Sequence, residues 1–427
     1  MIKIEELKKL LEENPEVSAY EIRQTVNDDR QLYFVLGRLE TSRAVNAETV
    51  NVTVYHDFDG FRGSSAFAIT ANDNEKTIKE KTVSAVTKAK AVRNPYYPLA
   101  EKSRNLSTYK QLSEPMTLSL KKVADDIFAA DHFENSSLNA TEIFGCLEHV
   151  RFINSNGVDH SFDETSLFAE TIPSYKNETD EYELYYCQSE GDLNAPFKAN
   201  VEEALRNVRY RAEARTPKEV NLPENLEIAV KGEMLGLLMG NFADDLSYAS
   251  LYNKMNHYGV GDEISPLPFD ITMMGELKGA LSSSPIDDHG LLLDKTRIIE
   301  AGKAAALWGD IRYGSYLKEE KITGNYSVIV LDNYQPDDEA LNRPHLTIMN
   351  FSSPQLDSAS GYFGGEVRLA LYEHDGLVEP LTGFSISGNI YEEIRTATFS
   401  SEKAFINERR TSGYGPKYMF LKGMKIH

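Results

Sequence analysis

Stretches of strand-forming residues, separated by turns, recur along most of this 427-residue chain. They restrict the chain to folds that contain several β-strands. The first 70 residues contain four of them, each rich in Val, Tyr, Phe and Thr. We place these strands at residues 19–26, 32–40, 49–57 and 64–70. Asn27-Asp28-Asp29 is expected to turn between the first two, and the glycine-containing segment 57–64 between the last two. The pattern predicts an antiparallel meander.

Helical periodicity marks the segments that are expected to cover this sheet. They are residues 1–16, 75–93, 118–130 and 199–214. In the second, Ile78, Val83, Val86 and Ala89 recur at helical spacing and should face inward. Further strands are expected at residues 143–155, 160–171 and 181–189. Asn156-Gly157 lies between the first two and is typical of a hairpin turn.

Two prolines within residues 216–223 mark a boundary, and 427 residues exceed what one hydrophobic core usually serves. We therefore divide the chain into two domains, residues 1–215 and residues 224–427. The first is predicted to be an α+β domain, with an antiparallel or mixed sheet and covering helices. The second is predicted to be mainly β, because its motifs are strands punctuated by glycine turns.

The composition excludes several classes of protein. No run of about 18 apolar residues exists to span a membrane, and the first 16 residues interleave charged with apolar residues, unlike a signal peptide. Cys146 and Cys187 lie outside any Cys-x-x-Cys pattern, so we expect buried free thiols and a cytoplasmic location, with a disulfide between the two as the alternative. A net charge of −21 repels a phosphate backbone, and no concentrated basic patch offsets it. We expect no direct contact with nucleic acid or with a membrane.

A different pattern begins after residue 225. Leu226, Ile228 and Val230 alternate as in a short strand, and they lead into residues 233–239, whose apolar side chains surround a helix. Apolar residues on every side imply burial, and glycines at every fourth position permit close packing. On the pattern alone, this segment is a buried core helix.

Five motifs follow this helix in a distinctive order. They are the segments 285–290 (Pro-Ile-Asp-Asp-His-Gly), 296–302, 360–369, 376–380 and 385–389. Their order and spacing resemble those of the closing motifs of the TldD/PmbA family, the "modulator of DNA gyrase" proteins. The helix at 233–239 resembles the metal-binding helix of the same family. The resemblance implies a proteolytic family, and over the first domain only the pattern of elements agrees.

The residues that would bind the metal differ from those of the protease branch. That branch carries His-Glu-Ala-Val-Gly-His on this helix, where the chain has Gly232-Glu233-Met234-Leu235-Gly236-Leu237. The resemblance places zinc ligands at Gly232, at Leu237 and, in a turn near the C-terminus, at Ser412. None of the three is a histidine or a cysteine, and a neutral serine hydroxyl is a poorer zinc ligand than a thiolate. Glu233 matches the general base, which acts on metal-bound water. We therefore predict no zinc and no other cofactor, and we assign no catalytic residue.

Two other kinds of site could be built from residues of this chain, a metal site at another place and a paired-carboxylate site. The nine histidines never lie within ten residues of each other, so a local histidine pair is excluded. His289, His345 and His374 with Asp287 define a metal site that distant segments would have to assemble. Asp287 with Asp288 would form a paired-carboxylate site. The simpler interpretations are hydrogen-bonded or surface histidines, and aspartates in a turn.

The resemblance implies a metal-free, PmbA/TldE-like subunit of a metalloprotease complex. Such a subunit would pair with a TldD-like metalloprotease subunit, and the two would enclose a chamber in which unfolded peptides are cleaved. Its own part would be to bind peptide along exposed strand edges. The alternatives are a stand-alone homodimeric peptide-binding or scaffold protein without protease activity, and a hydrolase with a relocated active site. Whether this chain is itself an enzyme stays open.

Overall fold

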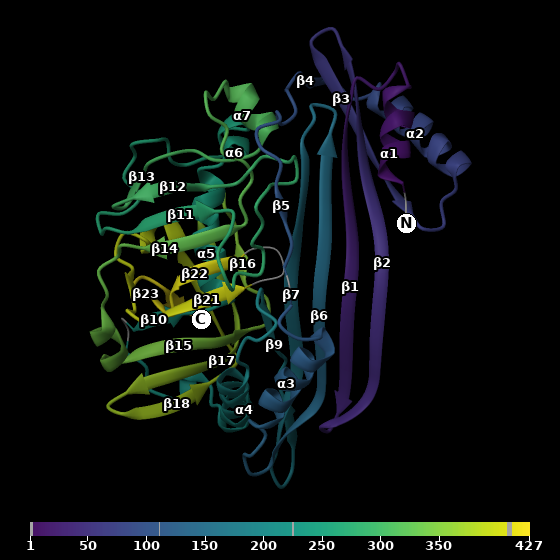
Figure 1. Cartoon of the computed structure of the whole chain (residues 1–427). Coiled ribbons are helices and arrows are strands. Elements are labelled where there is room, and N and C mark those ends of the chain that lie inside the picture. The colour runs from purple at the N-terminus through teal and green to yellow at the C-terminus, as the bar shows by residue number, and fades with distance from the viewer. Residues whose placement is uncertain (1–2, 111, 224–225, 408–411) are drawn as a thin grey trace.

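A computed structural model of the protein describes residues 3–110, 112–223, 226–407 and 412–427. The first half of the chain forms one nine-stranded sheet, whose longest strands run through most of the height of the molecule (Figure 1). Its strands are β1 (Ala19–Val35), β2 (Arg38–Phe58), β3 (Phe61–Thr70), β4 (Asn94–Pro95), β5 (Ser107–Thr108), β6 (Ser136–Asn154), β7 (Asp159–Lys176), β8 (Glu181–Glu183) and β9 (Tyr186–Glu190). The order is β4-β3-β2-β1-β6-β7-β5, and β8 and β9 also pair with β7. Because β5 runs parallel to β7 and the long strands are antiparallel, the sheet is mixed, as expected.

The β1–β2 hairpin differs from the predicted meander. Asn27-Asp28-Asp29 lies inside β1 rather than in a turn, and the chain turns instead at Leu36-Gly37, between Val35 and Arg38. Leu36 and Gly37 have φ of 46° and 72°, as the common two-residue hairpin turn requires. The prediction was wrong because this part of β1 has a partner strand on each side, β2 and β6. Their ladder hydrogen bonds keep the backbone extended despite its polar side chains.

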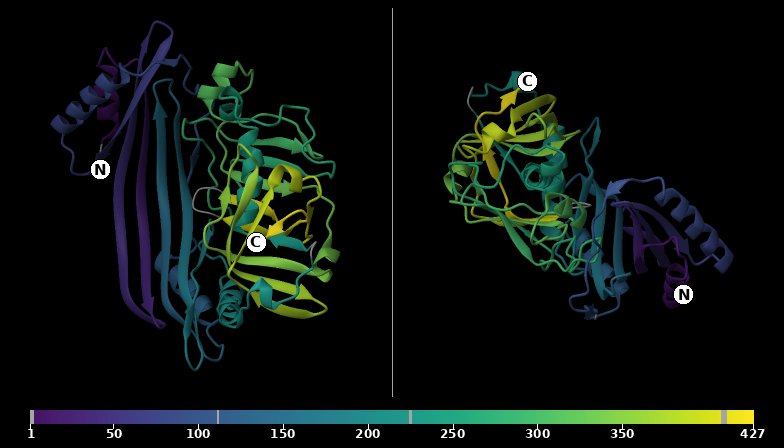
Figure 2. Two further views of the ribbon diagram at one scale, coloured as in Figure 1. Left: turned by 180° about the vertical axis from the view of Figure 1, so that it is seen from behind. Right: turned by 90° about the horizontal axis from the view of Figure 1, so that it is seen from above.

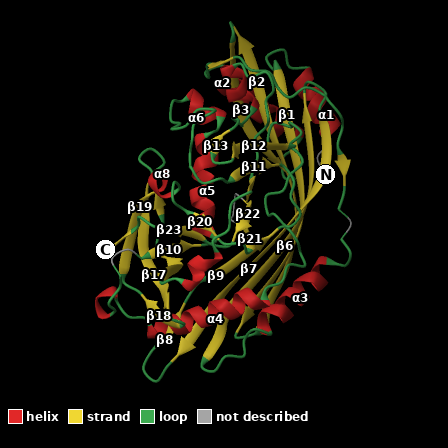
Figure 3. Ribbon diagram, turned by 90° about the vertical axis from the view of Figure 1, so that its left-hand side faces the viewer, coloured by secondary structure: helices red, strands yellow, loops and turns green. Residues whose placement is uncertain are grey.

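Four helices cover one face of this sheet (Figures 1 and 2). They are α1 (Ile4–Glu12), α2 (Glu75–Ala89), α3 (Met116–Phe128) and α4 (Lys198–Glu213). Helices α1 and α2 share a core with β1 to β3 at one end, and α3 and α4 share another with β6 and β7 at the opposite end (Figure 3). The inward face of α2 was partly mispredicted, since Val83 is 61% exposed whereas Thr82 is buried. Thr82 tolerates burial because its hydroxyl donates a hydrogen bond to the carbonyl of Ile78 (2.9 Å).

Two further sheets make up the second half of the chain. One consists of β10 (Glu227–Val230), β15 (His345–Phe351), β16 (Gln355–Leu356), β17 (Tyr362–His374), β18 (Leu377–Leu381), β19 (Phe384–Asn389), β20 (Thr398–Phe399), β23 (Met419–Leu421) and β24 (Lys425–Ile426). The other consists of β11 (Asp270–Met274), β12 (Lys295–Glu300), β13 (Lys303–Ala304), β14 (Val328–Asp332), β21 (Lys403–Asn407) and β22 (Ser412–Pro416). Their main paths are β20-β23-β10-β15-β17-β19-β24 and β13-β12-β11-β14-β22-β21. An α+β first part followed by a mostly β second part confirms the predicted fold class.

Helix α5 (Glu233–Asp245) shares one core with both of these sheets. Its apolar side chains pack against strands that include β10, β11, β15 and β17, which confirms a core helix. Leu237 is the exception, at 37% exposed. The remaining helices are short: α6 (Tyr248–Tyr252), α7 (Ile311–Leu317), α8 (Ile390–Glu393) and two 3-10 turns, η1 (Pro217–Glu219) and η2 (Asp338–Asn342).

The second half of the chain packs against the face of the long sheet that the four helices leave free (Figure 2). Strand side chains alternate between faces, and the register places Arg23 of β1, Phe152 of β6 and Glu164 of β7 on this shared face. The long sheet uses only residues before the boundary expected at 216–223, and the other two sheets use only residues after it. The division into domains itself stays a prediction.

Two expectations from composition can be compared with the fold. No helix in the described ranges is long and apolar enough to cross a membrane. No disulfide joins the two cysteines, as expected, but Cys187 is exposed and Cys146 is half-buried. The expectation of buried thiols was therefore wrong, because Cys187 lies on the short strand β9, which pairs with β7, and is exposed there.

Candidate functional site

The N-terminal end of α5 is the place where the sequence suggested a vacated metal site. The helix begins at Glu233, and Gly232 precedes it as the N-cap residue with φ 57° and ψ −130°. A Cβ at Gly232 would meet no atom within 4 Å, so the position is open, although its backbone favours glycine. Glu233 is exposed in the first turn, where its charge complements the helix dipole. Gly232 therefore lies outside the regular helix that carries Leu237.

Ser412 lies on β22, beside this helix. It is 2% exposed, and its Oγ accepts a hydrogen bond from the backbone N–H of Ser282 (3.0 Å). Ser412 lines a cavity of about 20 Å³ together with Leu235 and Gly236. The fold thus brings Ser412 next to α5, whereas Leu237 is absent from the lining of that cavity. The assignment of Gly232, Leu237 and Ser412 as vacated ligand positions stays a prediction, and Thr411, which precedes Ser412 in the motif, lies outside the described residues.

The histidines of the alternative metal site are dispersed. Each lies against a different carboxylate: His289 against Glu21 (3.3 Å), His345 against Glu373 (3.0 Å) and His374 against Glu379 (3.4 Å). Within the described part of the chain, no group of three or more His, Cys, Asp or Glu residues could hold a metal ion. The described histidines therefore do not assemble the site that His289, His345 and His374 suggested.

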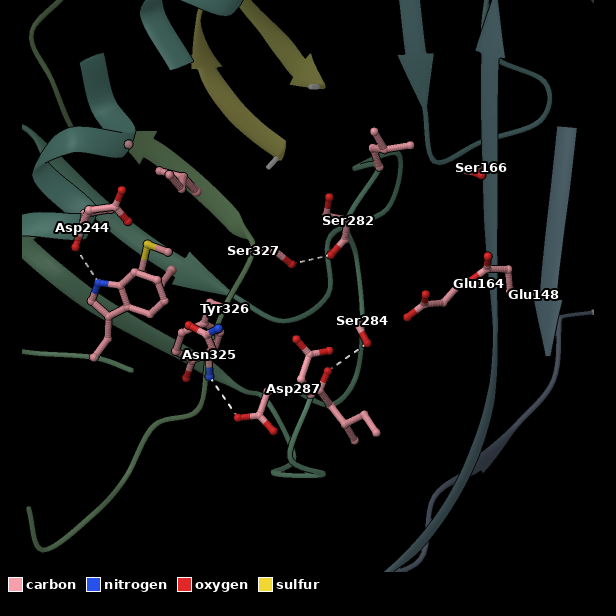
Figure 4. A pocket seen from close by; sticks show the side chains of 18 of the residues that line it. Glu148, Glu164, Ser166, Asp244, Ser282, Ser284, Asp287, Asn325, Tyr326 and Ser327 are labelled. Atoms are coloured by element: carbon pink, nitrogen blue, oxygen red, sulfur yellow. Dashed lines mark hydrogen bonds between the residues drawn. The ribbon is translucent and has the colours of Figure 1, made fainter. Parts of the chain in front are cut away.

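A larger cavity opens beside the other end of α5, between this helix and the long sheet (Figure 4). Its volume is about 670 Å³, a size typical of small-molecule sites. The long sheet contributes Arg23, Glu148, Glu164, Thr165 and Ser166, and α5 contributes Gly240, Ala243 and Asp244. The loop between β11 and β12, the side chain of Trp308 and the segment that leads into β14 complete the wall.

Carboxylates dominate the charge of this cavity. Glu148 and Glu164 are directly opposite each other on β6 and β7, a pairing of like charges that costs stability. Burial raises the pKa of Glu164 and Glu148 raises it further, against the lowering effects of Ser284, Arg23 and Lys110. One oxygen of Glu164, Oε1, is buried without a hydrogen-bond partner.

Asp244 faces the cavity from the helix side (Figure 4). Solvent reaches the residue through the cavity, yet the surrounding protein is dense enough that burial raises its pKa. Trp308 lies beside it, and the indole N–H donates a hydrogen bond to the carbonyl of Ala243 (2.6 Å). An apolar ring and an acid therefore stand side by side at this end of α5.

The segment 285–293 closes the cavity by docking on the long sheet. Asp287, 3% exposed, anchors it: Oδ1 accepts hydrogen bonds from the N–H groups of His289 and Leu291 (both 2.9 Å), and Oδ2 accepts one from Asn325 (3.1 Å). Burial raises the pKa of Asp287, against these hydrogen bonds and the charge of His289, which lower it. Asp288 is 84% exposed and lies 3.8 Å from Arg23. Each aspartate thus has its own partners, which supports a turn rather than a paired-carboxylate site.

His289 connects this segment to the sheet. Its Nδ1 lies 3.3 Å from both carboxylate oxygens of Glu21, which also accepts a hydrogen bond from the hydroxyl of Tyr55 (2.7 Å). Burial alone would lower the pKa of His289, but the hydrogen bond and charge of Glu21 raise it to about 9. Gly290 follows with φ 80°, and a Cβ there would lie 2.2 Å from a ring carbon of Phe152. The motif at 285–290 is therefore a contact between the two halves of the chain.

Comparison with known proteins matches this architecture. The sequence profile of the PmbA/TldA metallopeptidase C-terminal domain matches residues 223–427. These residues form a PmbA/TldD-family domain. None of the curated protein sequences compared with the chain matches it significantly.

Three solved structures share the fold over the whole chain. TldE from Thermococcus kodakarensis superposes with a TM-score of 0.78 at 16% identity and covers 99% of both chains. A proposed modulator of a DNA gyrase from Thermotoga maritima gives 0.79 at 15% identity and covers 100% of both. A similar protein from Bacteroides thetaiotaomicron gives 0.75 at 14%, covering 99% of this chain and 100% of the other. At such low identity the likeness shows the fold alone.

Sequence reasoning did not find the larger cavity of this chain. Alternation along β6 and β7 was enough to place Glu148 and Glu164 on one face of the sheet. No local pattern showed that Asp244, some 80 residues later, would face them, because that depends on how the two halves of the chain pack together. The apolar periodicity of α5 predicts that the helix is buried, and it does not mark Asp244, the one acidic residue of α5 that lines this cavity, as functional.

Proposed function

We propose that this chain is a metal-free, PmbA/TldE-like subunit of a TldD/PmbA-type metallopeptidase complex. The observation that carries the proposal is the chemistry at the three ligand positions of the protease branch. Gly232 has no side chain, Leu237 has a hydrocarbon one, and the Ser412 hydroxyl accepts a hydrogen bond from Ser282. None of them supplies the imidazole or thiolate that zinc sites in proteins use. Peptide cleavage is then the task of a TldD-like partner.

An exposed strand edge supports a role in binding another chain. β3 pairs with β2 only from Thr49 onward, so residues 38–48 of β2 have no strand on their outer side among the described residues. Residues 38–47 are exposed on both faces of the hairpin. An open edge of this length offers backbone donors and acceptors to a further strand. The added strand would come from the partner subunit or from an unfolded peptide.

The decisive experiment is to tag this chain in its native host and identify the proteins that purify with it. We expect a chain with an intact His-Glu-x-x-x-His motif in about equal amount. Recovery of this chain alone, or as a homodimer, would contradict the complex and favour a stand-alone scaffold protein.

A second measurement assigns the catalytic activity. The purified pair should contain zinc and degrade unstructured casein in a chelator-sensitive reaction, whereas this chain alone should do neither. Chelator-resistant hydrolysis of casein by this chain alone would instead support a relocated active site.

A further inference from the structure

The cavity between α5 and the long sheet contains carboxylates whose hydrogen-bonding capacity the fold uses only in part. Its other carboxylates have partners: Asp287 accepts three backbone N–H groups, Glu148 accepts the side-chain amide of Asn27 (3.1 Å), and Asp288 lies near Arg23. Glu164 differs, because its buried Oε1 has no hydrogen-bond partner. An unpaired buried carboxylate oxygen costs free energy that a bound donor would recover. The sheet wall therefore has a vacant acceptor.

Glu148 makes this acceptor more attractive for a cation. It stands directly opposite Glu164 on the neighbouring strand, and its negative charge raises the pKa of Glu164. Arg23 is the only basic residue among the described residues that line the cavity. A positive group placed between the two glutamates would relieve their repulsion and supply the missing donor.

The opposite wall offers a second carboxylate. Asp244 projects from α5 on the far side of the cavity from Glu164 (Figure 4). The residue is exposed to the solvent in the cavity, and desolvation by the protein around it raises its pKa. Apolar surface lies near it, from Met273, Trp308 and Ile329. The cavity thus has an acidic group on each of two walls and apolar side chains in its lining.

We propose that this cavity binds a linear organic dication, an aliphatic chain with an ammonium group near each end. One ammonium group donates to Oε1 of Glu164 between the two glutamates, and the other pairs with Asp244. The methylene chain packs against Trp308 and Met273, which removes apolar surface from water. Free polyamines and the side chains of a lysine-rich peptide both carry this chemistry. The site is independent of the proposed loss of zinc ligands at the other end of α5.

Direct titration tests the proposal, because Trp308 is the only tryptophan of the chain and lines the cavity. The full-length protein is titrated with 1,5-diaminopentane and with spermidine at 150 mM NaCl, by calorimetry and by tryptophan fluorescence. Pentylamine is the monocation control. We expect saturable 1:1 binding with a change in Trp308 emission, and affinities at least about tenfold tighter for the diamine than for pentylamine. Equal affinity for pentylamine, or no binding, would overturn the proposal.

Single-charge variants locate the site. Glu164→Gln and Asp244→Asn keep the size of the side chain and should each weaken diamine binding by about tenfold or more. Asp375→Asn is the matched control: it removes one negative charge at an exposed turn outside the cavity lining, where Asn tolerates the φ of 49°. It should leave the affinity unchanged. An equal loss in all three variants would show nonspecific attraction to a chain of net charge −21 and would overturn the site.

Thermal unfolding tests whether a variant binds the diamine more weakly only because the variant is less well folded. Glu164→Gln removes the repulsion from Glu148, and Asp244→Asn removes a desolvated acid, so both variants should unfold at the same temperature as the parent or higher. An acetylated and amidated Lys-Gly-Lys peptide then separates the two sources of the ligand. Tighter binding than that of 1,5-diaminopentane assigns the cavity to basic peptides, and weaker binding assigns it to free polyamines.

Discussion

The two ends of α5 differ in the chemistry they present. At the N-terminal end, Gly232 and Leu237 offer no polar side chain, and the nearby Ser412 offers a buried hydroxyl that accepts a hydrogen bond from Ser282. At the C-terminal end, Asp244 faces a cavity of about 670 Å³ that the long sheet and α5 line together. The helix positions predicted to have lost zinc ligands and the helix residue that faces the larger cavity therefore lie at opposite ends of α5. The predicted ligand positions on the helix lie at the first end, and the acidic residue that faces the larger cavity lies at the second.

The largest effect is expected when metal ligands are restored at the N-terminal end of α5. In the triple variant Gly232→His, Leu237→His, Ser412→Cys we expect zinc binding with a Kd of about 1 μM or tighter, which corresponds to about 8 kcal/mol. The open space at Gly232 and the exposure of Leu237 leave room for two imidazoles, and buried Ser412 can be replaced by a cysteine of similar size. The φ of 57° at position 232 adds a strain of about 1–2 kcal/mol. Zinc is measured by competition with a chromogenic chelator.

The control for this variant replaces Ser412 by Ala while keeping both new histidines. It should bind zinc at least tenfold more weakly, because the third ligand is missing. A folded triple variant that binds no better than this control would show that positions 232, 237 and 412 do not form one site. The N-terminal end of α5 could then not be interpreted as a vacated zinc site.

The C-terminal end of α5 depends on the docked segment 285–293. Asp287→Ala leaves three backbone N–H groups without their acceptor in a buried place, so we expect a loss of about 3 kcal/mol in the free energy of unfolding. Urea unfolding followed by the emission of Trp308 measures it. Asp288→Ala, one residue away and 84% exposed, should change stability by no more than about 0.5 kcal/mol. Equal losses in the two variants would refute the anchoring role of Asp287.

The stability that the docked segment 285–293 contributes should depend on pH, because this segment contains His289. Its pKa rises from 6.5 to about 9 in the folded protein, so the stabilisation is fully present below pH 6.5 and is lost as pH rises through about 9. The expected loss is about 2 kcal/mol, less than the full pKa shift implies because the ring keeps partial contact with solvent. The measurement is the stability difference between the parent and His289→Asn at pH 6.5 and at pH 9.5. A difference that does not shrink at pH 9.5 would contradict the ion pair with Glu21.

Local sequence patterns predicted the fold class and the core helix at 233–239, because apolar periodicity and glycine turns are local signals. They failed at Asn27-Asp28-Asp29, where pairing on both sides of β1 overrides turn-forming side chains. They also failed for the larger cavity. The shared face of Glu148 and Glu164 follows from alternation, but their proximity to α5 depends on Asp287 and His289 docking a distant segment onto the sheet. Packing between remote segments leaves no periodic trace in the sequence.

The smallest test compares two glycines on α5 itself. A Cβ at Gly236 would lie 2.8 Å from Cγ2 of Ile406, whereas a Cβ at Gly240 would meet nothing within 4 Å. Gly240→Ala should therefore stabilise the protein by about 0.5–1 kcal/mol, since Ala is the better helix former and has room beside the cavity. Gly236→Ala gains the same propensity but must push Ile406 away, and the net result should be a loss of about 1 kcal/mol. Urea unfolding of the two variants side by side decides the point. If both stabilise equally, the N-terminal half of α5 is packed as loosely against β21 as the C-terminal half is against the cavity.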